Sequence, residues 1–268
     1  TAETIDPRSA SMRFIARTSS ADSSAPRTSA AAAPTSPEAM RSAMPCAGSV
    51  STGGGLVFMG SRVAASPAGQ PERAFEAAGW EVFSVDIDPS RNATWTGDVR
   101  LLDPALLPGR PDLIWASPVC TQYSVCRQRA KTPRDLEWAD SLVLAVLRLQ
   151  EALGCPMLME NPHSSLLKRR PFMQGISFVT VDYCKYFSPG FPHRCRKRTA
   201  IYRFGADYEP SRPLCRHDCG FCEGGRHLEA IGNSTTQRQV RDQDETYRIP
   251  PLLCQEIAQW AGGLVAGG

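Results

Sequence analysis

The residues whose types could do chemistry together are a cysteine and a glutamate, each of which follows an apolar segment. Cys120 lies in a proline-marked loop directly after the segment 113–116, and Glu160 follows a second apolar segment forty residues later. In a parallel α/β sheet, loops from separate strands converge over one crevice at the carboxyl ends of the strands. A thiol and a carboxyl group placed there can act on one substrate. The alternative is a buried structural cysteine beside an unrelated loop acid, because the chain contains ten cysteines.

Strands and helices are expected to alternate along the chain, as such a sheet requires. The apolar and β-branched runs predict strands over 55–58, 80–85, 96–99, 112–116 and 155–159. Helices are predicted over 71–78, from an N-cap at Thr132 to a stop at Gly154, and over 249–260. This alternation predicts an α/β fold with a parallel, doubly wound (Rossmann-like) sheet. Asp86, Asp98, Cys120 and Glu160 would then all follow strand ends.

Composition limits the class of protein. The chain has 268 residues, of which 42% are hydrophobic and 21% charged, and no apolar run is long enough to span a bilayer, so we expect no membrane partner. Ser, Ala, Thr, Pro and Arg dominate residues 1–54, which predicts a disordered low-complexity tail; its alternative is a targeting segment. The first residue is Thr, so the sequence could be a fragment or a processed form. Ten cysteines without a secretory signal favour an intracellular, reducing compartment, with the nucleus and an organelle both open.

Positive charge is unevenly distributed, although the net charge is only +3. Residues 168–170 are all basic, and the stretch 185–216 contains eight Lys or Arg residues against two acids. Such a surface beside a crevice suits a phosphate backbone. The alternative is an ordinary solvated face.

Five short segments share their order and spacing with one protein family. They are 84–89 (SVDIDP), 97–100 (GDVR), 117–120 (SPVC), 159–162 (MENP) and 194–199 (RCRKRT). Together they resemble the DNA (cytosine-5) methyltransferases, over roughly residues 75–260, and most closely the compact members with a Ser-Pro-Pro-Cys loop. Val119 stands where those members have the second proline. The resemblance implies an S-adenosylmethionine-dependent methyltransferase fold that acts on DNA.

The resemblance also implies roles for the residues in these segments. Cys120 corresponds to the thiol that adds to carbon 6 of cytosine, and Glu160 to the carboxyl group that holds ring nitrogen 3 and the exocyclic amine. Arg196 and Arg198 match a cationic pair that contacts the base carbonyl and nearby phosphates. Chemistry of this kind requires the target base to be flipped out of the duplex.

S-adenosylmethionine is the cofactor that the resemblance implies. An acid after the second strand of such a sheet commonly accepts hydrogen bonds from ribose hydroxyls, and Asp86 has that position. Asp98 could receive the adenine amino group beside the backbone of Val99. Pro118 and Asn233 are the other expected cofactor contacts in this half of the pocket. Each acid could instead be a helix cap.

The glycine-rich turn that approaches the methionine part of the cofactor departs from the family pattern. Phe58 and Gly60 are followed by several extra residues before Gly69, which precedes the helix. Either an insertion separates residues that still act together, or the turn is altered. The second case leaves an inactive, methyltransferase-like nucleic-acid-binding protein as one alternative function. Methylation of RNA cytosine is the other.

A small insertion interrupts the expected catalytic domain, which comprises residues 55–202 and 244–268. The insertion, 203–243, is where the family places its target-recognition region. Cys215, Cys219, Cys222 and His227 lie within it and could bind a structural zinc ion, which would rigidify a segment too small to form its own core. The alternative is that these thiols are incidental.

Overall fold

The computed structural model describes residues 11–16, 55–60, 71–127, 130–189, 194–231, 237–240 and 246–266. These residues form a mixed α/β structure, which confirms the expected class. The α-helices are α1 (Pro71–Ala77), α2 (Leu136–Leu153) and α4 (Pro251–Ala266). The strands are β1 (Ser11–Ala16), β2 (Gly55–Gly60), β3 (Val82–Asp86), β4 (Trp95–Thr96), β5 (Pro111–Ser117), β6 (Met157–Pro162), β7 (Phe178–Asp182), β8 (Arg198–Phe204), β9 (Cys222–Glu223), β10 (Arg226–His227), β11 (Glu229–Ile231) and β12 (Arg238–Val240). Short 3-10 helices are η1 (Pro89–Arg91), η2 (Val99–Leu101), η3 (Pro104–Leu106), η5 (Leu166–Arg169), η6 (Pro171–Met173) and η7 (Tyr183–Tyr186).

Eight strands form one sheet in the order β4-β3-β1-β2-β5-β6-β8-β7, with an additional pairing between β3 and β2. The pairings β4–β3, β3–β2, β2–β5 and β5–β6 are parallel. In contrast, β8 is antiparallel to both β6 and β7, and β1 is antiparallel to β2 and β3. The sheet is therefore mixed rather than wholly parallel, and the doubly wound topology stays a prediction.

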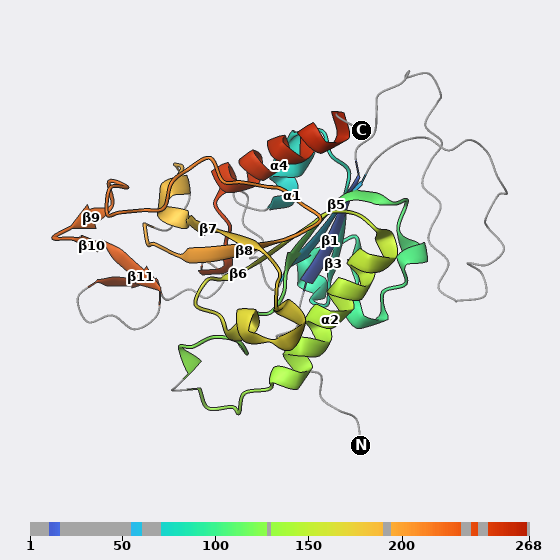
Figure 1. Ribbon diagram of the computed structural model, residues 1–268, viewed down its shortest axis with the longest axis horizontal. Helices are drawn as coiled ribbons and strands as arrows, with labels where there is room; N and C mark the ends of the chain where they lie inside the picture. The colour runs from blue at the N-terminus through green and yellow to red at the C-terminus, as the bar shows by residue number, and fades with distance from the viewer. Residues whose placement is uncertain are drawn as a thin grey trace.

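Helices cover both faces of the sheet, with α1 and α4 side by side on one face and α2 on the other (Figure 1). The side chains of β5 alternate between two buried clusters, because successive residues of a strand point to opposite faces. Leu113 and Trp115 pack with α1 and α4, whereas Ile114 and Ala116 pack with α2. Burial on both faces explains why β5 has a nearly continuous apolar sequence.

Helix α2 begins later than its sequence predicts. The N-cap is Asp135, whose Oδ1 accepts a hydrogen bond from the backbone N of Trp138 at 2.8 Å, so the predicted N-cap at Thr132 is wrong. Thr132 is instead held outside the helix, because its carbonyl accepts a hydrogen bond from Arg127 Nη2 at 2.7 Å. Gly154 ends the helix as expected, with φ of 59° and its N–H bonded to the carbonyl of Gln150.

Strand β1 lies inside the segment 1–54 that its composition predicts to be a disordered tail. Phe14 pairs with Val57 of β2 and with Phe83 of β3. The hexapeptide SMRFIA contains strand-forming residues that the Ser- and Ala-rich average of the longer segment conceals.

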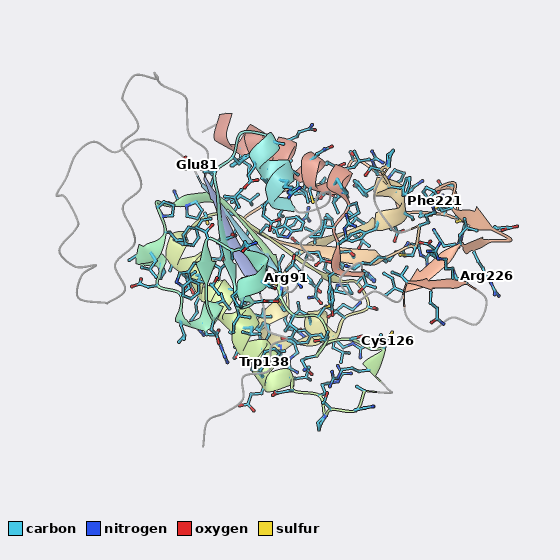
Figure 2. The ribbon with its side chains drawn as sticks, turned by 180° about the vertical axis from the view of Figure 1, so that it is seen from behind. Glu81, Arg91, Cys126, Trp138, Phe221 and Arg226 are labelled. Carbon is cyan, nitrogen blue, oxygen red and sulfur yellow. The ribbon has the colours of Figure 1, made fainter. Side chains whose placement is uncertain are left out.

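The excursion that follows β8 occupies the place of the predicted insertion. It contains the antiparallel pair β9–β10 and the parallel pair β11–β12, and it projects from one end of the main sheet (Figure 1). Phe221 and Arg226 lie on this projection, on the opposite side of the molecule from Glu81 (Figure 2). Its pairs consist of strands of two or three residues, which are too short to be stable by themselves.

A carboxylate of α4 anchors the beginning of the excursion. Glu256 Oε1 accepts hydrogen bonds from the hydroxyl of Tyr208 at 2.6 Å and from the backbone N of Ser211 at 3.1 Å. The hydroxyl of Tyr186, in η7, donates to the same oxygen at 3.2 Å. Residues 208–211 are therefore tied directly to α4, and through Glu256 to η7.

Among the described residues, no helix combines the length and the apolar character needed to cross a membrane.

We predict that Gly97→Ala destabilises the fold. A Cβ at position 97 would lie 2.5 Å from the indole ring of Trp95, which is partly buried and packs against the hydrophobic core. Such overpacking typically costs about 1–3 kcal/mol in the free energy of unfolding. Urea denaturation followed by tryptophan fluorescence would measure the loss. Gly109→Ala is the matched control, because a Cβ at position 109 would meet no atom within 4 Å. Equal unfolding midpoints for the two variants would contradict the prediction.

Candidate active site

Cys120 and Glu160 lie at neighbouring strands of the sheet. Cys120 is in the loop after β5, and Glu160 is near the end of β6. Ala116 of β5 pairs in parallel with Met159 of β6, so the two polypeptide segments reach the same edge of the sheet together. Asn161 then joins them, because its side-chain amide donates a buried hydrogen bond to the carbonyl of Pro118 at 3.2 Å. The Cys120 loop is thus attached to β6 on its first side.

A second attachment holds the far side of the same loop. The hydroxyl of Tyr123, which is fully buried, donates to Asp140 Oδ1 of α2 at 2.8 Å. Arg170 Nε donates to both carboxylate oxygens of Asp140, at 3.0 and 2.9 Å. In addition, the backbone N of Leu166 donates to the carbonyl of Tyr123 at 2.9 Å. The loop from 118 to 123 is therefore fixed at both ends.

The thiol of Cys120 is protonated at rest. Burial raises its pKa to about 11; the positive charge of Lys197 opposes this rise and the negative charge of Glu160 adds to it. Because the thiolate is the nucleophilic form, attack requires the proton to leave and a cation to favour the charged sulfur. Lys197 provides that cation.

Glu160 is 7% exposed and has two polar neighbours that sequence analysis did not identify. The hydroxyl of Tyr183 donates to Glu160 Oε1 at 3.2 Å, and Lys197 Nζ lies 3.7 Å from the same oxygen. Burial, with the charge of Glu160, raises the pKa of Tyr183 well above its usual value, so its hydroxyl remains a donor. Lys197 Nζ also lies 4.8 Å from the centre of the Tyr183 ring. The sequence offered one clue to Lys197, because it lies between Arg196 and Arg198, the two arginines predicted to contact the base and phosphates.

Arg196 and Arg198 lie in different surroundings. Arg198 forms a bidentate ion pair with the buried carboxylate of Asp182, with Nε at 2.8 Å and Nη2 at 2.7 Å. Arg196 lines a pocket of about 280 Å³ on the insertion side, together with Arg226 and His227. The predicted cationic pair is therefore split between the end of β7 and the insertion.

The predicted cofactor acids are both engaged in local hydrogen bonds. Asp86 is fully buried at the end of β3, and its Oδ1 accepts from the backbone N of Asp88 at 2.8 Å. Asp98 caps η2, where its Oδ1 accepts from the backbone N of Arg100 at 2.9 Å. Burial works to raise the pKa of Asp98, but the hydrogen bonds and charge of Arg100 outweigh it and the pKa is lowered. Val99 is buried beside this cap.

The backbone of β2 brings part of the predicted cofactor turn to the same edge. Phe58 and Gly60 both lie in β2, and Gly60 is in register with Ser117, the residue before Pro118. Two predicted cofactor residues lie outside the described residues: Gly69 and Asn233.

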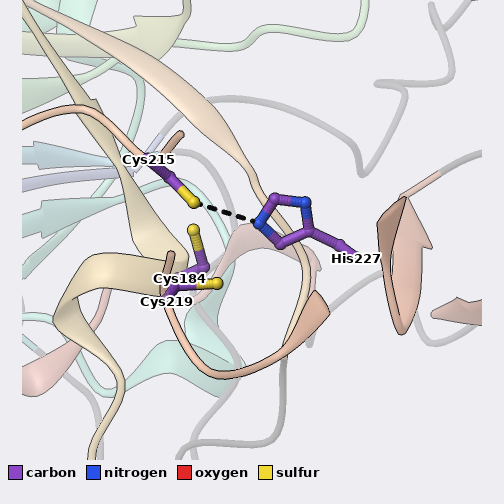
Figure 3. Close-up of side chains that lie close together, drawn as sticks. All are labelled: Cys184, Cys215, Cys219 and His227. Atoms are coloured by element: carbon purple, nitrogen blue, oxygen red, sulfur yellow. Dashed lines mark hydrogen bonds between the residues drawn. The ribbon is translucent and has the colours of Figure 1, made fainter. Parts of the chain in front are cut away.

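Three of the four predicted metal ligands come together, with a different fourth residue. The ligand atoms of Cys184, Cys215, Cys219 and His227 all lie within 4.8 Å of one another (Figure 3). Cys222 belongs instead to a second, overlapping group with His227 and a further histidine, His217. The sequence contains Cys184 far from the other cysteines, so no spacing motif marked it.

We predict that Lys197→Gln slows alkylation of Cys120 by iodoacetamide at pH 8. A thiol with a pKa of about 11 is ionised in about one molecule per thousand at that pH. Loss of the cation raises the pKa further, and each unit lowers the thiolate fraction about tenfold. Mass spectrometry of the peptide containing residue 120 measures the rate, in a Cys126→Ser background because exposed Cys126 shares that tryptic peptide.

The control for this experiment is Lys131→Gln, which removes an exposed lysine. Its alkylation rate should equal that of the parent protein. An unchanged rate in the Lys197 variant, across a pH series, would show that Lys197 does not act on the thiol.

Comparison with known proteins agrees with the motifs. No protein-family model matches the chain. The chain is similar to a protein of Frog virus 3 (isolate Goorha) described as a probable DNA (cytosine-5)-methyltransferase, with 26% identity over 214 residues. The match covers 70% of this chain and 92% of the viral protein. This similarity supports the assignment of the chain to the DNA (cytosine-5)-methyltransferase family that its ordered motifs indicate.

Proposed function

We propose that this protein transfers a methyl group from S-adenosylmethionine to carbon 5 of cytosine in DNA, through a covalent bond to Cys120. The observation that carries the proposal is the placement of Cys120, in the loop after β5, beside Glu160 of the adjacent parallel strand β6, with Lys197 acting on both. The similarity to a probable viral DNA (cytosine-5)-methyltransferase supports the same activity.

Cys120 is the nucleophile in this mechanism. Its sulfur bonds to carbon 6 of the ring as the thiol proton leaves, which makes carbon 5 electron-rich enough to take the methyl group. Loss of the hydrogen of carbon 5 as a proton then restores the ring double bond and releases the sulfur. The two attachments of the Cys120 loop, at Asn161 and Tyr123, hold the sulfur in one position throughout these steps.

Glu160 would hold the base, and a proton passed from its carboxyl group to ring nitrogen 3 would neutralise the negative charge that develops there when sulfur adds. A carboxyl group at this position can bind ring nitrogen 3 and the exocyclic amine together. Tyr183 orients the carboxyl through its hydroxyl hydrogen bond, and Lys197 lies within reach of the same oxygen. The carboxyl, the thiol and the lysine thus act at one substrate ring.

S-adenosylmethionine, when bound, supplies the methyl group. The ends of β2, β3 and β5 fit such a group, because Gly60 is in register with Ser117 and Asp86 ends the strand beside β2. The carboxylate of Asp98 already pairs with Arg100, and this ion pair is partly exposed. An adenine amino group would therefore have to share the carboxylate with Arg100. In this proposal the parallel strands β4, β3, β2, β5 and β6 are the core of a doubly wound, Rossmann-like methyltransferase fold.

The insertion over 203–243 would contact DNA, and the target base would be flipped into the crevice. Arg196 and Arg226 line one pocket on this side, where phosphate groups would find positive charge.

We predict that duplex DNA containing 5-fluorocytosine traps the enzyme. Fluorine replaces the hydrogen of carbon 5, so no proton can be removed from that carbon after methyl transfer. The covalent bond to Cys120 should therefore persist. The probe is a pool of duplexes that places 5-fluorocytosine before and after each of the four bases, incubated with S-adenosylmethionine. A complex that survives denaturing electrophoresis is the expected result.

Two variants control the trapping experiment. Cys120→Ser should form no adduct, whereas Cys155→Ser, which changes a buried cysteine between α2 and β6, should form it as the parent does. Absence of an adduct with the parent protein, under conditions where DNA binding is detected, would refute the covalent mechanism. An adduct with 5-fluorocytosine transfer RNA and none with DNA would identify RNA as the substrate.

We predict that Glu160→Gln lowers the rate of methyl transfer by about 10²–10⁴-fold, the range typical for loss of a positioned acid or base. The assay is transfer of labelled methyl groups to duplex DNA at saturating S-adenosylmethionine. Glu151→Gln, an exposed change on α2, should leave the rate unchanged. A Glu160 variant within a few fold of the parent would remove the carboxyl from the mechanism.

A further inference from the structure

Three cysteines and one histidine converge where the insertion meets the catalytic domain. Cys184 comes from η7, directly after β7, whereas Cys215, Cys219 and His227 come from the excursion that follows β8 (Figure 3). Cys184, Cys215 and His227 are buried, and Cys219 is half-buried. The mechanism proposed above uses none of these four side chains.

The spacing of the four ligand atoms suits a tetrahedral ion. With Zn–S bonds of about 2.3 Å and Zn–N bonds of about 2.0–2.1 Å, the edges of the tetrahedron measure about 3.5–3.8 Å. Cys215 Sγ lies 3.4 Å from His227 Nε2, and all four atoms lie within 4.8 Å of one another. These distances bracket the edges of such a tetrahedron, so small side-chain adjustments would complete the coordination.

An ion pair beside the cluster brings the same two segments together independently of the thiols. Lys185, the residue after Cys184, pairs with Asp218, the residue before Cys219, at 2.9 Å. The backbones that carry these cysteines are therefore adjacent for a reason other than the sulfur contacts. Three thiols and an imidazole of this kind favour zinc over hard, oxygen-seeking cations.

We propose that Cys184, Cys215, Cys219 and His227 bind one Zn²⁺ ion that fastens the insertion to the end of β7. Four protein ligands leave no open coordination position, so the ion is structural. The insertion needs such support, because its described strands have two or three residues each and none of their residues belongs to either buried hydrophobic cluster.

The ion would act on the catalytic edge through the residues next to its ligands. Cys184 follows Tyr183, which donates to Glu160. The backbone N of Cys215 donates to Asp182 Oδ2 at 2.9 Å, and Asp182 holds Arg198. Loss of the metal should therefore loosen both the insertion and the strand end that carries these contacts.

The first test measures the metal content of the full chain, expressed with added zinc and purified under reducing conditions without chelator. We expect about one zinc per chain in the parent and in the matched control Cys155→Ser, which removes a buried thiol elsewhere. Cys184→Ser should weaken zinc binding by more than about 100-fold. Loss of a residue that only supports a ligand typically costs roughly 10–100-fold, and loss of a ligand should cost more. A parent protein without stoichiometric zinc would overturn the proposal.

Cobalt substitution tests the ligand set even where Cys184→Ser does not fold. Co²⁺ bound to the parent should show the visible and thiolate charge-transfer bands of a tetrahedral site with three sulfurs. Cys222→Ser should give the same spectrum and the same affinity as the parent. A loss of sulfur-to-cobalt intensity in Cys222→Ser would instead make Cys222 a ligand and refute the proposed set.

Hydrogen exchange tests the connection to the catalytic edge, and it does not depend on methyl transfer. Removal of zinc by a chelator should speed amide exchange in β7 and η7 as well as in residues 205–231, while α2 keeps its protection. Faster exchange confined to the insertion would show that the metal does not support the catalytic edge.

Discussion

The hydrogen bonds of one buried carboxylate, Asp182, hold both the candidate site and the insertion in place. A charge that is 1% exposed is costly unless it is fully paired, and Asp182 is paired on two sides. Arg198, at the start of β8, gives it two hydrogen bonds, and the backbone N of Cys215, in the insertion, gives it one. Neither contact can be lost without leaving part of the charge unsatisfied. Asp182 at the end of β7 therefore joins the start of β8 to the insertion.

The loop that carries Cys120 is held by a comparable pair of contacts, to β6 and to α2. Cys120 is in a loop without regular structure, and such a loop would normally be mobile. Asn161 attaches its beginning to β6, and Tyr123 attaches its end to α2 through Asp140. Both attachments are buried, so water does not compete for them. The position of the sulfur is therefore fixed by contacts to the sheet and to α2, unlike that of a side chain on a free surface loop.

Local sequence patterns were sufficient where a single segment determines the structure, and insufficient where distant segments meet. The apolar runs before Cys120 and Glu160 predicted β5 and β6, and Gly154 predicted the end of α2. The start of α2 was wrong because Arg127 holds Thr132 outside the helix, a contact that no capping pattern contains. Cys184 was missed for a similar reason, since only the fold brings it to the other ligands. The roles of Cys120 and Glu160 remain predictions that rest on the motifs and on this geometry.

The three consecutive basic residues of segment 196–198 point to three different places. Residues at positions two apart along an extended chain point to the same side, which would place Arg196 and Arg198 together and Lys197 opposite them. The chain reaches β8 only at Arg198, so this alternation does not yet constrain the residues before it. Arg196 can therefore turn to the pocket of the insertion, while Lys197 turns to Glu160 and Arg198 to Asp182. Because Lys197 and Arg198 pair with different carboxylates and Arg196 lines the insertion pocket, this short segment joins the surroundings of Glu160 to the insertion.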